Sequence, residues 1–354
     1  MQVAKKTLGS IQLLRGIACI LVVLLHITIN CEEKTGGIFL FNIFKFGGSG
    51  VDIFFVLSGF IITYTNFTYI GKPFTGVKYL KRRFIRIFPI YWIIITCLIL
   101  LQILLPDFYN TKFDTGIFNI IQTYLLLPGH VMLNGVSWSL TNELFFYLLY
   151  ALAIVIPQKK ISFYLLIIYF CILIVFAIIG PVNLLGSSSL TIFLFPMNIE
   201  FILGVFVVLI VNSILPKYVF PILIVGIVIF MFGAFLNDRN IDLSRSFSNQ
   251  ALNRVLLFGI PSFLIILALV KMELTKNIYL HSIFLKLGDA SYSIYLLHLP
   301  IVAAFFKIMA KLRIENTAIT QLFCLLLLIL VCSIGVWIYH NIEKPIIRAL
   351  NKLL

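Results

Sequence analysis

The sequence predicts an all-α integral membrane protein, a single bundle of about ten transmembrane helices built by residues 1–354. Hydrophobic residues make up 61% of the chain, whereas a soluble domain is roughly 45–50% apolar. Charged residues make up 11%, against about 25% in soluble proteins. The mean hydropathy is +1.10, and long apolar runs follow one another without a linker. Lipid is therefore expected to be the main solvent of this protein.

Ten stretches are long and apolar enough to cross a membrane, because a helical span needs about 20 mostly apolar residues. They lie near 11–30, 47–65, 87–105, 138–157, 162–180, 190–212, 218–236, 251–270, 290–310 and 319–341. An even number of spans places both termini on one side. If that side is the cytoplasm, two thirds of the 27 Lys and Arg residues face it, as the positive-inside rule requires.

One further apolar stretch, Ile117–Leu127, is too short to span easily. We expect it to be an interfacial or re-entrant segment on the outer face. The N-terminal Lys5 and Lys6 precede an apolar run as in a signal peptide, but Arg15 interrupts that run. No small-residue cleavage site follows, so this run is expected to stay as the first span.

The composition argues against two common kinds of site. The net charge of +14 does not predict nucleic-acid binding, because the basic residues stand in short loops between apolar runs rather than on one face. The six cysteines show no metal-ligand spacing, and five of them lie inside apolar runs. We therefore expect buried packing cysteines and no metal site.

Ionisable residues inside the spans are the candidate functional residues, since each costs about 2.5–3.5 kcal/mol to insert. Arg15 and His26 share one helix face and are separated by about 16 Å along the axis, which puts Arg15 near the cytoplasmic boundary and His26 in the outer half. Asp52 and Glu143 are predicted to lie at the level of His26, where a carboxylate can orient a buried imidazole. The alternatives are helix packing for both acids and for His26, and an interfacial position for Arg15.

A second group of candidates is basic. The predicted inner loop KYLKRRFIRIFPIYW contains the densest cluster of cations, Lys81, Arg82, Arg83 and Arg86. Such a cluster either sets the topology or binds phosphate through the forked donors of arginine.

The order of these motifs resembles that of the acyltransferase-3 family of bacterial membrane O-acyltransferases. The resemblance rests on the Arg15–His26 spacing, GVDIFFVLSGF, RFIR before PIYW, WSLTNELFFY, LGDASYSIYLLHLP and the terminal EKP. The Ser137–Tyr147 stretch and the lack of a fused hydrolase-like domain most resemble the exopolysaccharide-acetylating branch of this family. The resemblance implies acetyl-CoA as a cytoplasmic donor substrate, no permanently bound cofactor, and a location in the bacterial inner membrane. The implied acceptor is a sugar hydroxyl of a polysaccharide or lipid-linked oligosaccharide.

The resemblance also assigns roles to residues. His26 matches the essential histidine of the family, Arg15 its partner arginine, and Arg83 and Arg86 the paired arginines, so these three arginines are expected to bind acetyl-CoA. We expect Glu143 to orient His26, and Asp52 or nearby backbone donors to stabilise the oxyanion. Whether His26 deprotonates the acceptor or carries the acetyl group stays open. Further acceptor-binding or supporting candidates are Trp138, Ser139, Glu200, Tyr292 and His298.

Two other functions fit parts of the pattern. A transporter or flippase for lipid-linked saccharides also places His, Asp and Glu inside the membrane. The sequence shows no repeated half with paired broken helices, however, which is the usual sign of alternating access. A structural membrane subunit leaves the costly buried residues unexplained.

Overall fold

The computed structural model describes residues 8–105, 113–129, 131–179, 192–238, 250–276, 279–312 and 317–353. Within these ranges every regular element is helical, which confirms the predicted fold class, and nine segments are long and apolar enough to cross a membrane. Their main helices are α1 (Gly9–Thr35), α2 (Ser49–Asn66), α3 (Gly76–Leu104), α5 (Ser137–Val155), α6 (Lys159–Ile179), α9 (Pro216–Asp238), α11 (Ile260–Thr275), α13 (Ser291–Lys311) and α14 (Thr317–Ile338).

The predicted span at 190–212 differs from the others. Its first two residues lie outside the described ranges, and the helix observed there, α8 (Asn198–Ile210), has 13 residues. Such a helix is about 20 Å long, shorter than the roughly 30 Å hydrocarbon core. The described part of the chain therefore shows nine full-length candidates and one short helix, where the sequence predicts ten.

The short helix α8 makes a close crossing with α2. A Cβ atom on Gly59 of α2 would lie 1.9 Å from the carbonyl oxygen of Phe201, and one on Gly204 of α8 would lie 2.1 Å from that of Val56. Glycine at these two positions lets the backbones touch, as small residues do in membrane helix pairs.

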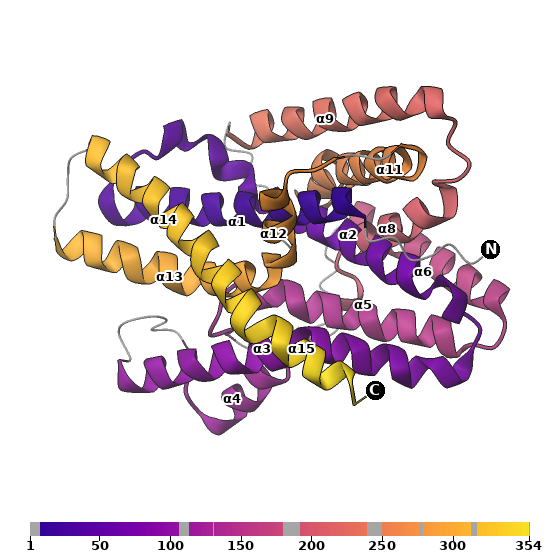
Figure 1. Ribbon diagram of the computed structural model, residues 1–354, viewed down its shortest axis with the longest axis horizontal. Helices are drawn as coiled ribbons and strands as arrows, with labels where there is room; N and C mark the ends of the chain where they lie inside the picture. The colour runs from indigo at the N-terminus through magenta and orange to yellow at the C-terminus, as the bar shows by residue number, and fades with distance from the viewer. Residues whose placement is uncertain are drawn as a thin grey trace.

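The short helix α4 (Ile117–Tyr124) accounts for the extra apolar stretch. Its 8 residues extend about 12 Å, so the expectation that this stretch does not span is confirmed. The Tyr91 hydroxyl donates to the carbonyl oxygen of Thr123 (2.7 Å), and the Trp92 indole donates to that of Tyr124 (3.0 Å). Because Tyr91 and Trp92 lie near the middle of α3, the segment turns back alongside that helix (Figure 1).

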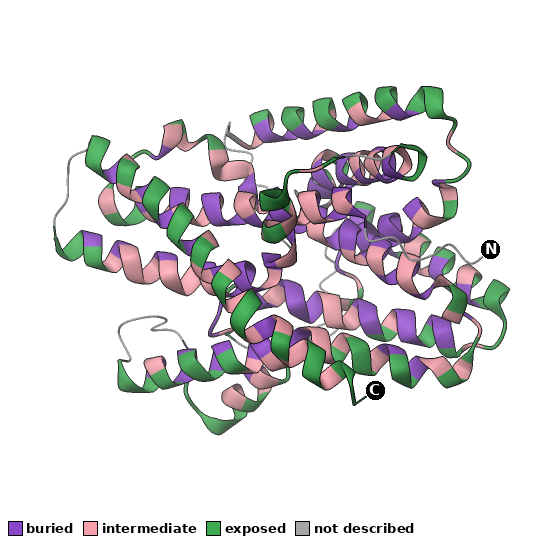
Figure 2. Ribbon diagram, viewed as in Figure 1, coloured by how far each residue is buried: buried purple, intermediate pink, exposed green. Residues whose placement is uncertain are grey.

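Helices α2 and α13 start near the middle of the bundle's length rather than at one of its ends (Figure 1). Helix α12 (Ser282–Asp289) lies across the middle of the molecule (Figure 1), and α13 begins directly after it at Ser291. The 3₁₀ segment η1 (Leu40–Gly48) has positive φ angles at Leu40, Phe41 and Asn42 and leads the chain into α2. The first turns of α2 and α13 consequently reach the centre, where buried residues gather (Figure 2).

Basic residues gather at one end of the bundle. Helix α3 begins at one end, which carries Lys78, Lys81 and Arg82 and is called the basic end here. Helix α1 begins in the half of the molecule nearer to this end, and α15 (Lys344–Asn351) ends there too (Figure 1). Helix α1 runs from there toward the opposite end, which places His26 farther from the basic end than Arg15.

Candidate functional site

Three adjoining spaces extend from the basic end into the centre of the bundle. The arginine cavity, of about 140 Å³, is lined by Arg15, Arg83 and Arg86 among others. The histidine cavity, of about 390 Å³, contains His26. The basic groove, of about 690 Å³, lies at the start of α3. Arg83 and Arg86 line both the groove and the arginine cavity, while Val51 and Tyr295 line both cavities and form their junction.

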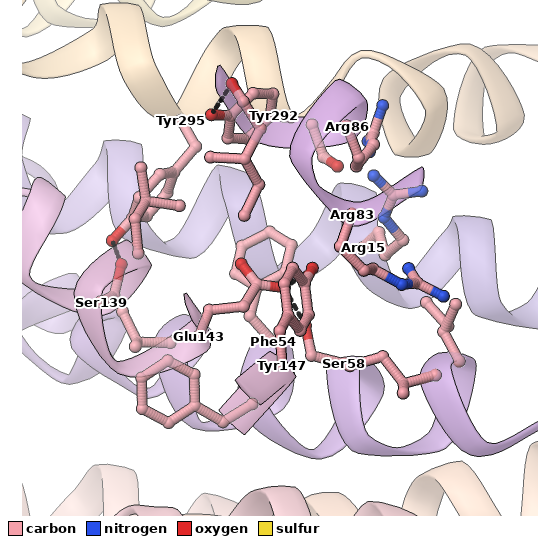
Figure 3. A pocket seen from close by; sticks show the side chains of 17 residues that line it. Arg15, Phe54, Ser58, Arg83, Arg86, Ser139, Glu143, Tyr147, Tyr292 and Tyr295 are labelled. Carbon is pink, nitrogen blue, oxygen red and sulfur yellow. Dashed lines mark hydrogen bonds between the residues drawn. The ribbon is translucent and has the colours of Figure 1, made fainter. Parts of the chain in front are cut away.

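Arg15 and Arg83 carry cationic charge into the arginine cavity. Arg15 Nη1 donates to Gln12 Oε1 at 3.1 Å. Arg83 Nη2 donates to Thr65 Oγ1 at 3.3 Å, and its guanidinium lies over the ring of Tyr147, 5.5 Å from the centroid. Among the described residues, neither arginine has a carboxylate within ion-pairing distance. The three guanidinium groups gather on one wall (Figure 3), and those of Arg15 and Arg83 are suited to binding an anion.

Arg86 has a different environment. Its Nη1 lies 2.6 Å from Oε1 of the fully buried Glu343, which also accepts a 2.5 Å hydrogen bond from Ser293. Its guanidinium lies over the Tyr292 ring, and the Tyr292 hydroxyl donates to the carbonyl oxygen of Ile87 at 2.9 Å. Arg83 and Arg86 are both predicted to bind acetyl-CoA, and the structure shows that they differ: the charge of Arg86 is already compensated by Glu343.

The expectation that Glu143 contacts His26 is also wrong. Glu143 lines the arginine cavity, and its Oε1 accepts hydrogen bonds from Ser58 and Tyr147, both at 2.7 Å. Ser139, one turn earlier on α5, bonds to the Tyr295 hydroxyl at 2.7 Å, at the junction of the cavities. Glu143 therefore lies one turn beyond the junction, on the arginine side (Figure 3).

Asp52 does not face His26 either. It is fully buried and accepts bonds from Arg254 Nε at 2.9 and 3.1 Å and from Arg254 Nη2 at 2.8 Å. The same Nη2 donates to the carbonyl oxygen of Gly48 at 2.7 Å. A carboxylate bound in this way cannot stabilise an oxyanion of like charge, and its effect is to hold Arg254 in the lining of the histidine cavity.

Arg254 is the residue that reasoning from the sequence missed. Its signal was a lone arginine near the start of the apolar run 251–270. Glu200 lies beside the Asp52–Arg254 pair, is fully buried and lines neither cavity. A Cβ atom on Gly259 would lie 2.7 Å from Glu200 Oε1, so Glu200 packs against the backbone of the segment that follows Arg254.

His26 contacts a second histidine. Its Nδ1 lies 2.8 Å from the carbonyl oxygen of Val22 and 3.3 Å from His298 Nε2. The two rings meet edge to face, with centroids 4.9 Å apart. His298 is fully buried, and its Nδ1 lies 2.6 Å from the carbonyl oxygen of Tyr295. A carbonyl oxygen can only accept a hydrogen bond, so each neutral ring carries its proton on Nδ1. Nε2 of a neutral His26 then has a free lone pair.

The remaining candidates are divided between the spaces. Trp138 lies in the lining of the histidine cavity, close in sequence to Ser139 at the junction. Tyr292 lies in the arginine cavity. Among the residues predicted to surround His26, the structure places Trp138 in the lining of the same cavity and His298 in contact with the His26 ring.

A cavity that can hold an anion and an adjoining cavity that contains an imidazole are what group transfer between two substrates inside a membrane requires. The class that this fold and site define is a multi-pass membrane acyltransferase. A family model described as an acyltransferase domain matches residues 8–338, and the chain belongs to that family. It is 26% identical over 337 residues to the exopolysaccharide production protein ExoZ of Rhizobium meliloti (strain 1021), covering 90% of this chain and 94% of ExoZ. No solved structure gives a significant match.

Proposed function

We propose that the protein transfers an acetyl group from cytoplasmic acetyl-CoA to a sugar hydroxyl of an exopolysaccharide or its lipid-linked precursor, in the bacterial inner membrane. The observation that carries this proposal is the series of three spaces with shared walls. The basic groove, the arginine cavity and the histidine cavity follow one another from the basic end toward the opposite end. The similarity to ExoZ supports an exopolysaccharide acceptor.

The donor enters at the basic end. Lys78 and Arg82 in the groove, with Arg83 and Arg15 deeper inside, bind the phosphates of CoA through charge-assisted hydrogen bonds. The pantetheine arm extends through the arginine cavity, and its thioester reaches the junction formed by Val51 and Tyr295. Arg86 keeps its bond to Glu343 and holds this wall in place.

The acceptor occupies the histidine cavity, where the Trp138 ring offers an apolar face to a sugar. His26 Nε2 takes the proton of the acceptor hydroxyl while the hydroxyl oxygen attacks the thioester carbon. The carbon–sulfur bond then breaks, and the CoA thiolate receives the proton from His26. The products are an acetyl ester and CoA thiol, with no net gain or loss of protons.

A direct test uses the purified protein in liposomes with acetyl-CoA and an acceptor oligosaccharide, without any ion gradient. We expect free CoA thiol to appear only when the acceptor is present. His26→Gln and His26→Ala should abolish thiol release while acetyl-CoA binding and membrane level persist, because an amide or a methyl group cannot take up a proton near neutral pH.

Two results would contradict this proposal. A saccharide flippase would move its cargo and release no thiol, and near-parental activity in His26→Gln would place the chemistry elsewhere. Incubation with labelled acetyl-CoA alone separates the chemical routes, since label retained on His26 would indicate an acetyl-imidazole intermediate instead of direct transfer. NMR of surface polysaccharide from a deletion strain and its parent, compared for lost O-acetyl signals, identifies the acceptor.

A further inference from the structure

We infer that His298 is the positioning residue of His26: its Nε2 accepts a hydrogen bond from His26 Nδ1–H and thereby directs the His26 Nε2 lone pair into the histidine cavity. The inference rests on the proposed function, which makes His26 the point of transfer. It gives a neutral histidine the orienting role that the sequence suggested for Glu143.

The geometry fixes the direction of this hydrogen bond. His298 Nδ1 is 2.6 Å from the carbonyl oxygen of Tyr295, and a carbonyl accepts, so the His298 proton is on Nδ1 and its Nε2 is an acceptor. That Nε2 lies 3.3 Å from His26 Nδ1. His26 Nδ1 also lies 2.8 Å from the Val22 carbonyl oxygen, so His26 donates from Nδ1 to both acceptors.

The charges around His26 show why this hydrogen bond is needed to stabilise the protonated ring during transfer. When His26 takes up a proton at Nε2, its Nδ1–H becomes a stronger donor, and both acceptors stabilise the imidazolium. The cations in the histidine cavity are Lys45 and Arg254, and they are paired with Glu32 and Asp52, respectively. In the described lining of this cavity no carboxylate is available to His26.

The contact also restricts the protonation of His298. If His298 Nε2 carried a proton, two N–H groups would face each other across 3.3 Å, which is repulsive. His298 therefore acts as a neutral acceptor, backed by the Tyr295 ring 5.6 Å away and shielded from solvent. Its position results from the start of α13 in the middle of the bundle, which brings the second turn of α13 beside α1.

Three substitutions at one position test this role. In His298→Gln the side-chain oxygen can still accept from His26 Nδ1–H, so turnover should stay within about threefold of the parent. His298→Leu removes the acceptor, and His298→Asn keeps a polar group that is too short to reach. Both should lower kcat by about 10- to 100-fold, the range expected for a lost hydrogen bond to a charged group, without changing KM for either substrate.

A second readout does not depend on transfer. Diethyl pyrocarbonate modifies an unprotonated, accessible imidazole nitrogen, and mass spectrometry can compare His26 with the exposed His340 in the same sample. We expect His26 modification to slow in the Leu and Asn variants and to persist in the Gln variant. This result would stand even if the wild-type protein transferred no acetyl group, so the two proposals fail separately.

A packing role predicts the opposite order, since leucine suits a buried apolar position at least as well as glutamine. Parental turnover and His26 reactivity in His298→Leu would therefore overturn the inference. If the leucine variant fails to fold, as judged by acetyl-CoA binding, the comparison of Gln with Asn decides. Equal turnover in those two variants would overturn it as well.

Discussion

Arg83 and Arg86 lie three residues apart on α3, and both line the arginine cavity and the basic groove. Their partners separate them. Arg83 contacts a hydroxyl and aromatic rings, whereas Arg86 is bound to the buried Glu343. A single motif of two arginines thus contains one cation suited to a ligand and one that joins α3 to the segment after α14.

Arg83→Ala should weaken acetyl-CoA binding by about 10- to 100-fold, since a charge-assisted hydrogen bond is worth about 1.5–3 kcal/mol. Its melting temperature in detergent should stay near that of the parent. Arg83→Lys should recover only part of the affinity, because lysine lacks the forked donor geometry. Isothermal titration with acetyl-CoA measures both effects.

Arg86→Ala is the control for Arg83→Ala, because it removes the neighbouring arginine of the same motif. It leaves Glu343 buried without its cation, so it should lower the free energy of unfolding by on the order of 3 kcal/mol, and Glu343→Gln in the same chain should restore part of the loss. If Arg86→Ala instead weakens donor binding as much as Arg83→Ala with unchanged stability, the assignment of Arg86 as an anchor is wrong.

At the scale of elements, interruptions in helices create the site. Pro300 lies inside α13 and has no amide proton, which leaves the carbonyl of Leu296 without its helical donor. Asn134 fills that place with a 2.9 Å hydrogen bond. This bond attaches the loop before α5 to α13. Beside it, the Tyr295 hydroxyl donates to the carbonyl oxygen of Val136 at 3.3 Å.

The crossing of α2 and α8 is expected to be sensitive to a single methyl group. Gly59→Ala would place a Cβ atom 1.9 Å from the backbone oxygen of Phe201, so the helices must separate. We expect a loss of about 1–3 kcal/mol in the free energy of unfolding, the usual effect of overpacking, measured by thermal or SDS-induced unfolding.

Gly48→Ala provides the control for that experiment. A Cβ atom at this position would lie 3.5 Å from its nearest neighbour, Leu25 Cδ2, which is ordinary van der Waals contact. Its stability should therefore equal that of the parent. An equally stable Gly59→Ala variant would show that the close crossing does not contribute to the packing of α2.

At the scale of the whole molecule, the two ends of the bundle are expected to face different compartments. We expect the basic end to be cytoplasmic, because the cations at the start of α3 favour that side and the donor that we propose, acetyl-CoA, is cytoplasmic. In a chain whose six native cysteines are replaced, Lys78→Cys should react with impermeant maleimide only after the cells are opened.

Glu33→Cys, at the opposite end of α1, is the control and should react in intact spheroplasts. Labelling of position 78 from outside would reverse the orientation, and the assignment of the basic groove to a cytoplasmic donor would fail with it. The order of the three spaces along the bundle would be unchanged by that result.

The sequence by itself determined the helical membrane class, most of the spans and the face shared by Arg15 and His26. These features follow from apolar run length and the helical repeat, which are local properties of the chain. The high cost of placing ionisable groups in lipid also singled out His26, Asp52 and Glu143 as residues that need partners.

Only the tertiary structure decided which residues contact His26, Asp52 and Glu143. Depths derived from the sequence assume that every helix starts at the membrane surface, but α2 follows η1 and α13 follows α12 near the middle of the bundle's length (Figure 1). Those displaced starts bring His298 to His26. Asp52 instead meets Arg254, and Glu143 lies in the arginine cavity. Partner choice depends on where helices from distant parts of the chain begin and cross, which no local pattern of residues encodes.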